Sequence, residues 1–333
     1  MVEEQSHRSG SVNTAAPDPA PRGLGLYAIG VVAATLFLMF VGAMVTTRDA
    51  GLAVPDWPLS FGSLNPDGWW EKELVRLEHS HRLLGATIGL LTTALAIWVW
   101  RANPGRSLRW LGPVAFLAVC VQGVLGGLRV TNVSTTLAIV HGCAGQLFFC
   151  LLVAIAVVHT RAWRGGVRIA DPAALARLRL LTWGFLAAAF LQLVLGAVMR
   201  HLKAGLAIPD FPLAFGRLIP PVHSFAIDLH FTHRVWALAV LAGAVLLCVH
   251  VLRKFPNARP LVAGSAVLAA MVLLQILLGA SVIWTQRAAV PTCLHVVNGA
   301  LVLGAGVFLM LHAHAVRPHG PLLASRPGVA IFA

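Results

Sequence analysis

The chain has 333 residues, of which 58% are hydrophobic and only 11% are charged, and its mean hydropathy is +0.80. This leaves too little polar surface for a soluble globular protein, so the composition predicts an integral membrane protein. Lys and Arg outnumber Asp and Glu by 25 to 12. Because these basic residues stand mostly in short segments between apolar runs, they indicate membrane topology, and we expect no nucleic-acid partner.

Residues 1–24 are rich in Ser, Pro, Ala and Gly, and we expect them to form a disordered cytoplasmic tail. Eight apolar runs follow, each near the roughly 20 residues needed to cross the bilayer core. They cover residues 25–47, 77–100, 108–128, 135–159, 177–200, 228–252, 262–283 and 291–315. Because the backbone must satisfy its own hydrogen bonds in lipid, these runs predict eight transmembrane helices and an all-α fold in contact with the lipid bilayer.

Orientation follows from the segments between the runs. Basic residues concentrate in the tail and after the second, fourth, sixth and eighth runs, whereas the other loops hold most of the acidic residues. By the positive-inside rule, both termini are predicted to be cytoplasmic. Residues 161–178, with their Gly-Gly and Asp-Pro pairs, predict a cytoplasmic linker, and residues 316–333 a second cytoplasmic tail.

The sequence contains an internal repeat. Residues 42–64 align without gaps on residues 196–218, with 13 of 23 positions identical at an offset of 154. Each copy contains four spans, so the repeats share one orientation and predict two pseudo-symmetric four-helix bundles, residues 25–160 and 179–315. The repeated loops share the pattern Gly-Leu-Ala-x-Pro-Asp-aromatic-Pro-Leu, which fits either a turn that closes the bundle or a lid over a ligand.

Four histidines lie in corresponding spans of the two repeats. His81 and His233 are 152 residues apart and His141 and His295 are 154 apart, and each is near the extracytoplasmic end of its helix. Two imidazoles at one level of a four-helix bundle are the axial ligands that a haem iron requires. Packing within the bundle is the alternative for any one of them. Zinc would lack ligands, because the five cysteines form no CxxC pair.

Span two opens with Glu78, three residues before His81 and therefore on the same helix face. The second repeat has His230 at this position, so only the first bundle has a carboxylate beside its histidine. A carboxylate in a partly dry pocket can accept or donate protons, which predicts chemistry in the first bundle and a cofactor in the second. The alternative is a simple ion pair between Glu78 and Arg82, one turn away.

Other polar residues receive less specific interpretations. Arg82 and Arg234 follow their histidines in both repeats and fit the propionates of haem, or else helix-end carbonyls. The same anion-binding role is open to Arg129, Arg200 and Lys203. Gln122 and Gln275, together with nearby glycines, indicate helix packing, and we expect His79, His201 and His223 to lie outside the bundles, solvated or bound by loops.

Taken together, the Glu-x-x-His-Arg start of span two, the His-x-x-His-Arg start of span six, the histidines of spans four and eight and the repeated loops resemble the haem A synthase family, over residues 25–315. Neither large loop contains a cysteine, so the chain resembles the cysteine-poor branch of that family. The resemblance implies a location in the bacterial plasma (inner) membrane, with the haem sites near the extracytoplasmic side.

The resemblance implies oxidation of the C8 methyl group of haem O to the formyl group of haem A, for aa3-type terminal oxidases. By the resemblance, haem O would be bound by His81, His141 and Arg82. A haem b cofactor would be bound by His233, His295 and Arg234, and Glu78 would be catalytic. It also implies haem O synthase, an external electron donor and terminal oxidase assembly factors as partners. A non-catalytic dihaem b electron-transfer protein is the alternative, and a transporter is disfavoured because no span is broken at mid-membrane.

Overall fold

The computed structural model describes residues 22–102, 106–160, 163–164, 168–169 and 171–318. Within these ranges, eight helices are long and apolar enough to cross a membrane, which confirms the predicted all-α membrane class. The long helices are α1 (Arg22–Thr47), α2 (Glu73–Ala102), α4 (Leu111–Thr131), α5 (Thr135–Val158), α7 (Pro172–His201), α8 (Phe225–Lys254), α9 (Arg259–Trp284) and α10 (Ala289–Ala315). The smaller elements are α3 (Arg106–Arg109), the 3-10 helix η1 (Ala204–Leu206) and the parallel two-residue strands β1 (Arg168–Ile169) and β2 (Arg317–Pro318).

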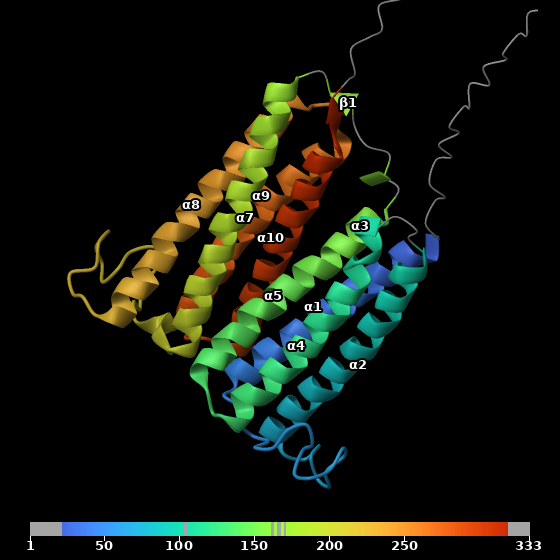
Figure 1. The fold of residues 1–333 in the computed structure, drawn as a ribbon. Helices are drawn as coiled ribbons and strands as arrows, with labels where there is room; N and C mark the ends of the chain where they lie inside the picture. The colour runs from blue at the N-terminus through green and yellow to red at the C-terminus, as the bar shows by residue number, and fades with distance from the viewer. Residues whose placement is uncertain (1–21, 103–105, 161–162, 165–167, 170, 319–333) are drawn as a thin grey trace, which may run out of the picture.

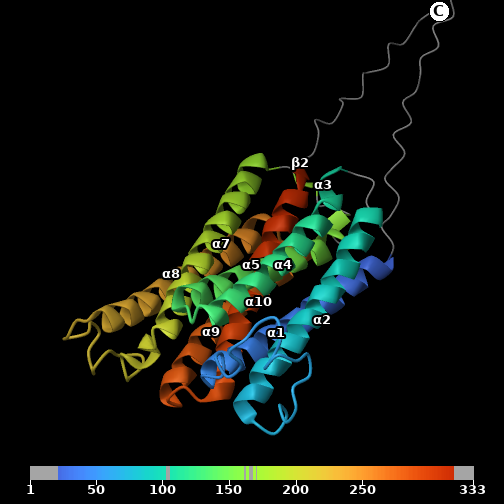
Figure 2. The same ribbon diagram turned by 60° about the horizontal axis from the view of Figure 1, so that its bottom comes forward.

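The long helices pack as two groups of four (Figure 1). In one group α1 contacts α2 and α5, and α4 contacts α2 and α5; in the other, α7 contacts α8 and α10, and α9 contacts α8 and α10. Helix α10 also packs against α1 and α5, and α5 against α7, so the two bundles share an interface. Figure 2 shows the same two groups after rotation. A pseudo-symmetry axis between the bundles stays a prediction.

Two long loops, residues 48–72 and 202–224, leave the same end of the molecule, which we call the loop end (Figures 1 and 2). Each bundle has its own apolar core, and its fully buried members include Leu95 and Leu152 in the first and Leu247 and Leu309 in the second. These residues lie at least two turns from the histidines of the same helices, on the side away from the loops. Apolar packing therefore occupies mainly the half of each bundle opposite the loop end.

The join between the bundles differs in detail from the sequence expectation. Helix α7 begins at Pro172, within residues 161–178, because Asp171 caps it by accepting a hydrogen bond from the Ala174 backbone N–H at 2.9 Å. Proline suits the first helical turn, where its missing N–H has no intrahelical acceptor. The Asp-Pro pair within the predicted linker thus starts a helix. The predicted tails, residues 1–24 and 316–333, fall outside the described residues apart from 22–24 and 316–318. Residues 22–24 belong to helix α1 and not to a disordered tail.

The repeated loops adopt the same turn. Asp56 accepts hydrogen bonds from the backbone N–H groups of Phe61 and Gly62, both at 2.7 Å. Asp210 makes the same pair of bonds five and six residues further along its own loop, at 2.7 and 2.8 Å. Gly62 has a φ of +75°, in the left-handed region that glycine adopts most readily. The loop pattern is therefore a structured turn in both copies.

We expect the first turn to lose its structure in acid. The backbone N–H groups of Gly62 and Phe61 hold the pKa of Asp56 below its usual value of 3.8, because they stabilise the charged carboxylate. A depressed folded pKa means that the stabilisation is present above the unfolded value and disappears as pH falls through the folded value. Asp56→Asn should expose the loop to pepsin across acidic pH, whereas the unsubstituted loop should be cut only below pH 3.8.

The matched control is Asp67→Asn, which removes an exposed carboxylate from the same loop. Its cleavage profile should follow that of the unsubstituted chain. Equal pepsin resistance of Asp56→Asn and Asp67→Asn would show that the Asp56 bonds do not hold the turn.

Candidate functional site

The four repeat-related histidines lie at one level of the molecule. His81 and His233 are the ninth residues of α2 and α8, and His141 and His295 are the seventh residues of α5 and α10. At about 1.5 Å per residue, each is roughly 9–12 Å from the loop end of its helix. His81 and His141 lie close enough within the first bundle for their charged forms to repel each other, as do His233 and His295 within the second. The structure thus brings the histidines together in two pairs.

Each of these imidazoles packs against a glycine of a neighbouring helix. A Cβ atom added to Gly42 or Gly196 would lie 2.8 or 3.0 Å from the Cε1 atom of His81 or His233. A Cβ atom on Gly126 or Gly279 would lie 3.2 Å from Cε1 of the facing histidine, His141 or His295. These distances are too short for a relaxed side chain. The glycines therefore leave space for the imidazoles, whereas the sequence indicated only close helix packing.

The nitrogens of the histidine pairs fit the axial ligation of a haem. Nδ1 of His81, His141 and His233 is buried and has no hydrogen-bond partner among the described residues. A buried imidazole whose Nδ1 has no partner is costly, and coordination of a metal through Nε2 is one interaction that can offset this cost. Within the same residues, no group of three or more His, Cys, Asp or Glu side chains could hold a metal ion. Two imidazoles per bundle therefore suit a porphyrin iron better than a protein-ligated zinc.

Glu78 is buried beside the first pair, with 4% of its surface exposed. Its Oε1 atom accepts a hydrogen bond from Arg82 Nη2 at 3.0 Å, while Oε2 is buried and has no partner. His230 at the equivalent position differs, because its Nδ1 is 3.2 Å from the Ile208 backbone N–H and its Nε2 is 3.1 Å from Arg234 Nε. Among the described residues, only the first bundle thus has an unpartnered carboxylate oxygen beside its histidine pair.

Arg82 and Arg234 hold the loops against the helices. Arg82 donates hydrogen bonds to the backbone carbonyls of Val54, Asp56 and Leu59 at 2.8, 2.6 and 2.9 Å. Arg234 donates to carbonyls of the second loop at 3.1 and 3.0 Å. The Nη groups of both arginines are therefore hydrogen-bonded to loop carbonyls. This fits the alternative that these arginines bind backbone carbonyls better than it fits propionate binding. Binding of a propionate by either residue stays a prediction.

Two other arginines at this level have no carboxylate within ion-pair distance among the described residues. Arg129 donates a hydrogen bond to the Gly51 carbonyl and interacts electrostatically with Glu78. Arg200 belongs to the second bundle but donates to the Ala43 carbonyl and to Thr47 Oγ1 of α1, at 2.6 and 2.8 Å. It therefore links the two bundles near the histidine level.

His79 is bound by the first loop, which is one of the two alternatives expected from the sequence, and it is also buried, which was not expected. Expected outside the bundle, it is 3% exposed, and its Nδ1 shares a 2.9 Å hydrogen bond with Ser60 Oγ of the first loop. The Trp69 ring lies against it, with ring centroids 4.6 Å apart. The repeat could have indicated that this position is buried, because the second copy has the apolar residue Phe231 there. His79 thus ties the first loop to α2, next to Glu78.

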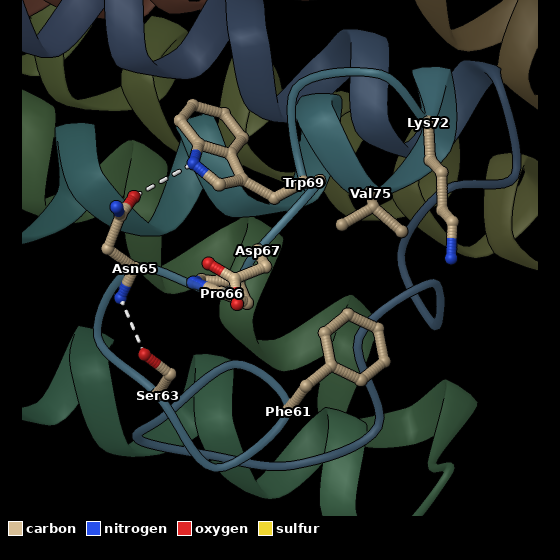
Figure 3. Close-up of a pocket in the computed structure, with 9 residues that line it drawn as sticks. Phe61, Ser63, Asn65, Pro66, Asp67, Trp69, Lys72 and Val75 are labelled. Atoms are coloured by element: carbon tan, nitrogen blue, oxygen red, sulfur yellow. Dashed lines mark hydrogen bonds between the residues drawn. The ribbon is translucent and has the colours of Figure 1, made fainter.

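Trp69 also borders a cavity of about 330 Å³ at the loop end (Figure 3). The lining residues are Phe61, Ser63, Asn65, Pro66, Asp67, Gly68, Trp69, Lys72 and Val75. Trp69 Nε1 donates to Asn65 Oδ1 at 2.9 Å, and the Asn65 backbone N–H donates to Ser63 Oγ at 3.1 Å. Neither Glu78 nor any of the four histidines lines this cavity. It is a feature of the loop and is separate from the histidine pairs.

We expect His79→Phe, which copies the second repeat, to loosen the first loop. Phenylalanine can still contact Trp69 but cannot bond Ser60, and one such hydrogen bond contributes about 1 kcal/mol. That difference corresponds to about fivefold in the population of opened loop. Trypsin cleavage after Lys72 should be faster by this factor. His223→Phe, an exposed histidine in the second loop, is the control, and equal cleavage in both variants would contradict the prediction.

Comparison with known proteins identifies relatives along most of the chain. The family model COX15-CtaA, described as cytochrome oxidase assembly protein, matches residues 70–307. A "Heme A synthase" of Symbiobacterium thermophilum is 32% identical, over 72% of this chain and 77% of its own length. Proteins of the same name are 30% identical in Caulobacter vibrioides, over 84% and 91%, and 25% identical in Geobacillus kaustophilus, over 89% and 93% of the two chains.

Proposed function

Because the chain belongs to the COX15-CtaA family of cytochrome oxidase assembly proteins, we propose that it is a haem A synthase. It oxidises the C8 methyl group of haem O to the formyl group of haem A, as the name of its relatives indicates. The single structural observation that carries the assignment is the pair of two-histidine sites, only one of which has a buried carboxylate with an unpartnered oxygen. The relatives are named as enzymes, so the comparisons do not support the alternative of a non-catalytic electron-transfer protein.

We place the substrate in the first bundle. His81 and His141 hold the haem O iron, and Glu78 lies on the same face of α2 as His81. Its Oε2 atom is free to accept or donate a proton near the substrate, while Arg82 keeps Oε1 in place. Two successive hydroxylations, each a two-electron oxidation that inserts one oxygen atom from an external oxidant, would convert the methyl group to a geminal diol, which loses water to give the aldehyde. The first loop, fastened by Arg82 and His79, limits the access of water to this reaction.

The second bundle holds the cofactor in this proposal. His233 and His295 are the residues that would ligate haem b, and their glycine neighbours leave room for the rings. Haem b, when bound, supplies one-electron transfer between an external electron donor and the substrate bundle. Arg129 and Arg200, which form no ion pair with a carboxylate among the described residues, are further candidates beside Arg82 and Arg234 to receive propionates. Haem O synthase and terminal oxidase assembly factors are the expected partners.

The test of the function is to express the chain together with a source of haem O and to analyse the extracted haems. We expect the hydroxymethyl and formyl haems to appear only when the chain is present. Unchanged haem O, in membranes that contain the folded chain and an electron donor, would contradict the enzymatic assignment.

We also propose that the protein lies in the bacterial plasma membrane with its loop end outside the cytoplasm and both termini inside. An impermeant thiol reagent should label Asp67→Cys, in the first loop, in intact cells. It should label Asn257→Cys, between α8 and α9, only after lysis. The unsubstituted chain controls for its own cysteines. The reverse labelling pattern would invert the topology.

A further inference from the structure

The second bundle surrounds its histidine pair with amide side chains. Gln192 Nε2 donates a hydrogen bond to the His233 backbone carbonyl at 3.0 Å and lies 3.3 Å from His233 Nε2. Gln275 repeats this arrangement, since its Nε2 donates to the His295 carbonyl at 2.9 Å and lies 3.3 Å from His295 Nε2. Each histidine is therefore held at its backbone and its ring by a glutamine of a neighbouring helix.

Asn298 extends this arrangement within α10. Its Nδ2 donates to Gln275 Oε1 at 2.8 Å and to the Met271 carbonyl at 2.9 Å, and its side chain is buried. His295 Nδ1 is 3.1 Å from the Gln275 carbonyl, so the ring proton is on Nδ1. The lone pair is then on Nε2, on the other side of the ring. This is the arrangement in which a histidine ligates a metal through Nε2 while a carbonyl orients the ring.

The first bundle lacks most of this network. At the same offsets, Leu38 replaces Gln192 and Ala144 replaces Asn298, and only Gln122 is kept. Among the described residues, Nδ1 of His141 has no hydrogen-bond partner, whereas Nδ1 of its repeat mate His295 bonds the Gln275 carbonyl. Nδ1 of His81 has no partner, as is also true of His233, so His81 and His233 differ in the bond from Gln192 to the His233 carbonyl. The histidines of the two bundles are therefore equivalent in position but not in how firmly they are held.

We propose that Gln192, Gln275 and Asn298 are positioning residues that make the second bundle retain its haem, and that their absence lets the first bundle exchange haem. This inference rests on the proposed function. A haem A synthase must release its product at each turnover but must keep its cofactor. The three amides hold His233 and His295 in place before ligation, so less side-chain freedom is lost when the iron binds. The bonds from the glutamines to the backbone carbonyls leave the imidazole lone pairs free and are compatible with iron at Nε2. The 3.3 Å contacts of Gln192 and Gln275 with the Nε2 atoms would give way to the iron.

The test transfers the first bundle's residues into the second. Gln192→Leu and Asn298→Ala, alone and combined, are purified with bound haem and mixed with excess apomyoglobin, which captures released haem b. Removing residues that orient a metal ligand typically weakens metal binding by about 10–100-fold. We expect haem b to be lost faster by a factor in this range. The reduced haem b spectrum and its midpoint potential should also shift, which a merely structural defect elsewhere would not cause.

The reciprocal variant Leu38→Gln with Ala144→Asn should slow the release of haem from the first bundle and raise the haem content of the purified protein. Gln146→Leu is the matched control, because it removes another buried amide, on α5, outside the network. It should leave the loss of haem b unchanged. Equal rates of haem b loss in the unsubstituted chain, Gln192→Leu and Asn298→Ala would overturn the inference.

Failure of the inference can be separated from failure of the proposed function with His295→Ala. If His295→Ala removes haem b but the amide variants do not accelerate its loss, the cofactor assignment stands and the positioning role is wrong. If the unsubstituted chain and His295→Ala carry the same haem b, the cofactor assignment itself is wrong, and the inference is overturned with it.

Discussion

Glu78→Gln should abolish formation of the hydroxymethyl and formyl haems while haem b stays bound. The substitution keeps the size of the side chain and an oxygen that can accept the hydrogen bond from Arg82, but it removes the group that can accept or donate a proton. General acid–base groups typically contribute about 10²–10⁴-fold to a rate, so conversion of haem O should fall by at least about 100-fold. The measurement is chromatography of haems extracted from membranes that also supply haem O.

Two observations make this prediction specific. Glu73→Gln changes an exposed carboxylate five residues earlier on α2 and should leave conversion unchanged. Bound haem b in Glu78→Gln, measured by its reduced spectrum, verifies that the protein is folded. If Glu78 only formed an ion pair with Arg82, glutamine would retain most of the activity. Conversion in Glu78→Gln near that of Glu73→Gln would therefore show that the carboxylate is structural.

The helices could be predicted because each apolar run has the length that a bilayer requires. The boundaries of the helices could not. Helix α2 begins at Glu73, four residues before the predicted span, since its first turn contains the charged residues Glu73 and Arg76 and extends beyond the apolar run. Helix α7 also begins before its predicted apolar run, at a cap formed by Asp171. Hydropathy detects the part of a helix in lipid, whereas caps and polar turns extend the helix beyond it.

The histidine pairs could be found in the sequence because the repeat placed them at equal offsets. The targets of Arg82 could not, because they are backbone carbonyls 23–28 residues away, and every residue has such a carbonyl. The position of Gln192 beside His233 was missed for a related reason, since it depends on how α7 packs against α8. Differences between the repeats, such as Leu38 against Gln192, are the sequence signal that could have identified these contacts.

His233→Ala and His295→Ala should each remove most of the haem b that co-purifies with the chain. Loss of either axial ligand leaves the iron with one protein ligand. The apolar core of the bundle lies mainly farther from the loop end, so it contributes little to holding the haem. The reduced b-type spectrum, normalised to protein, is the measurement, and we expect a fall of about tenfold or more, as for loss of groups that support a metal site.

Histidines elsewhere on the same helices provide the controls. His250→Ala on α8, where the imidazole contacts the Ala174 carbonyl, and His314→Ala on α10 should keep the normal spectrum. His81→Ala and His141→Ala should lower the binding of haem O and leave haem b in place, because these residues belong to the other bundle. A normal b-type spectrum in both His233→Ala and His295→Ala, with loss in His81→Ala, would exchange the roles of the two bundles. Glu78 would then lie beside the cofactor, and the proposed chemistry would have no carboxylate at the substrate.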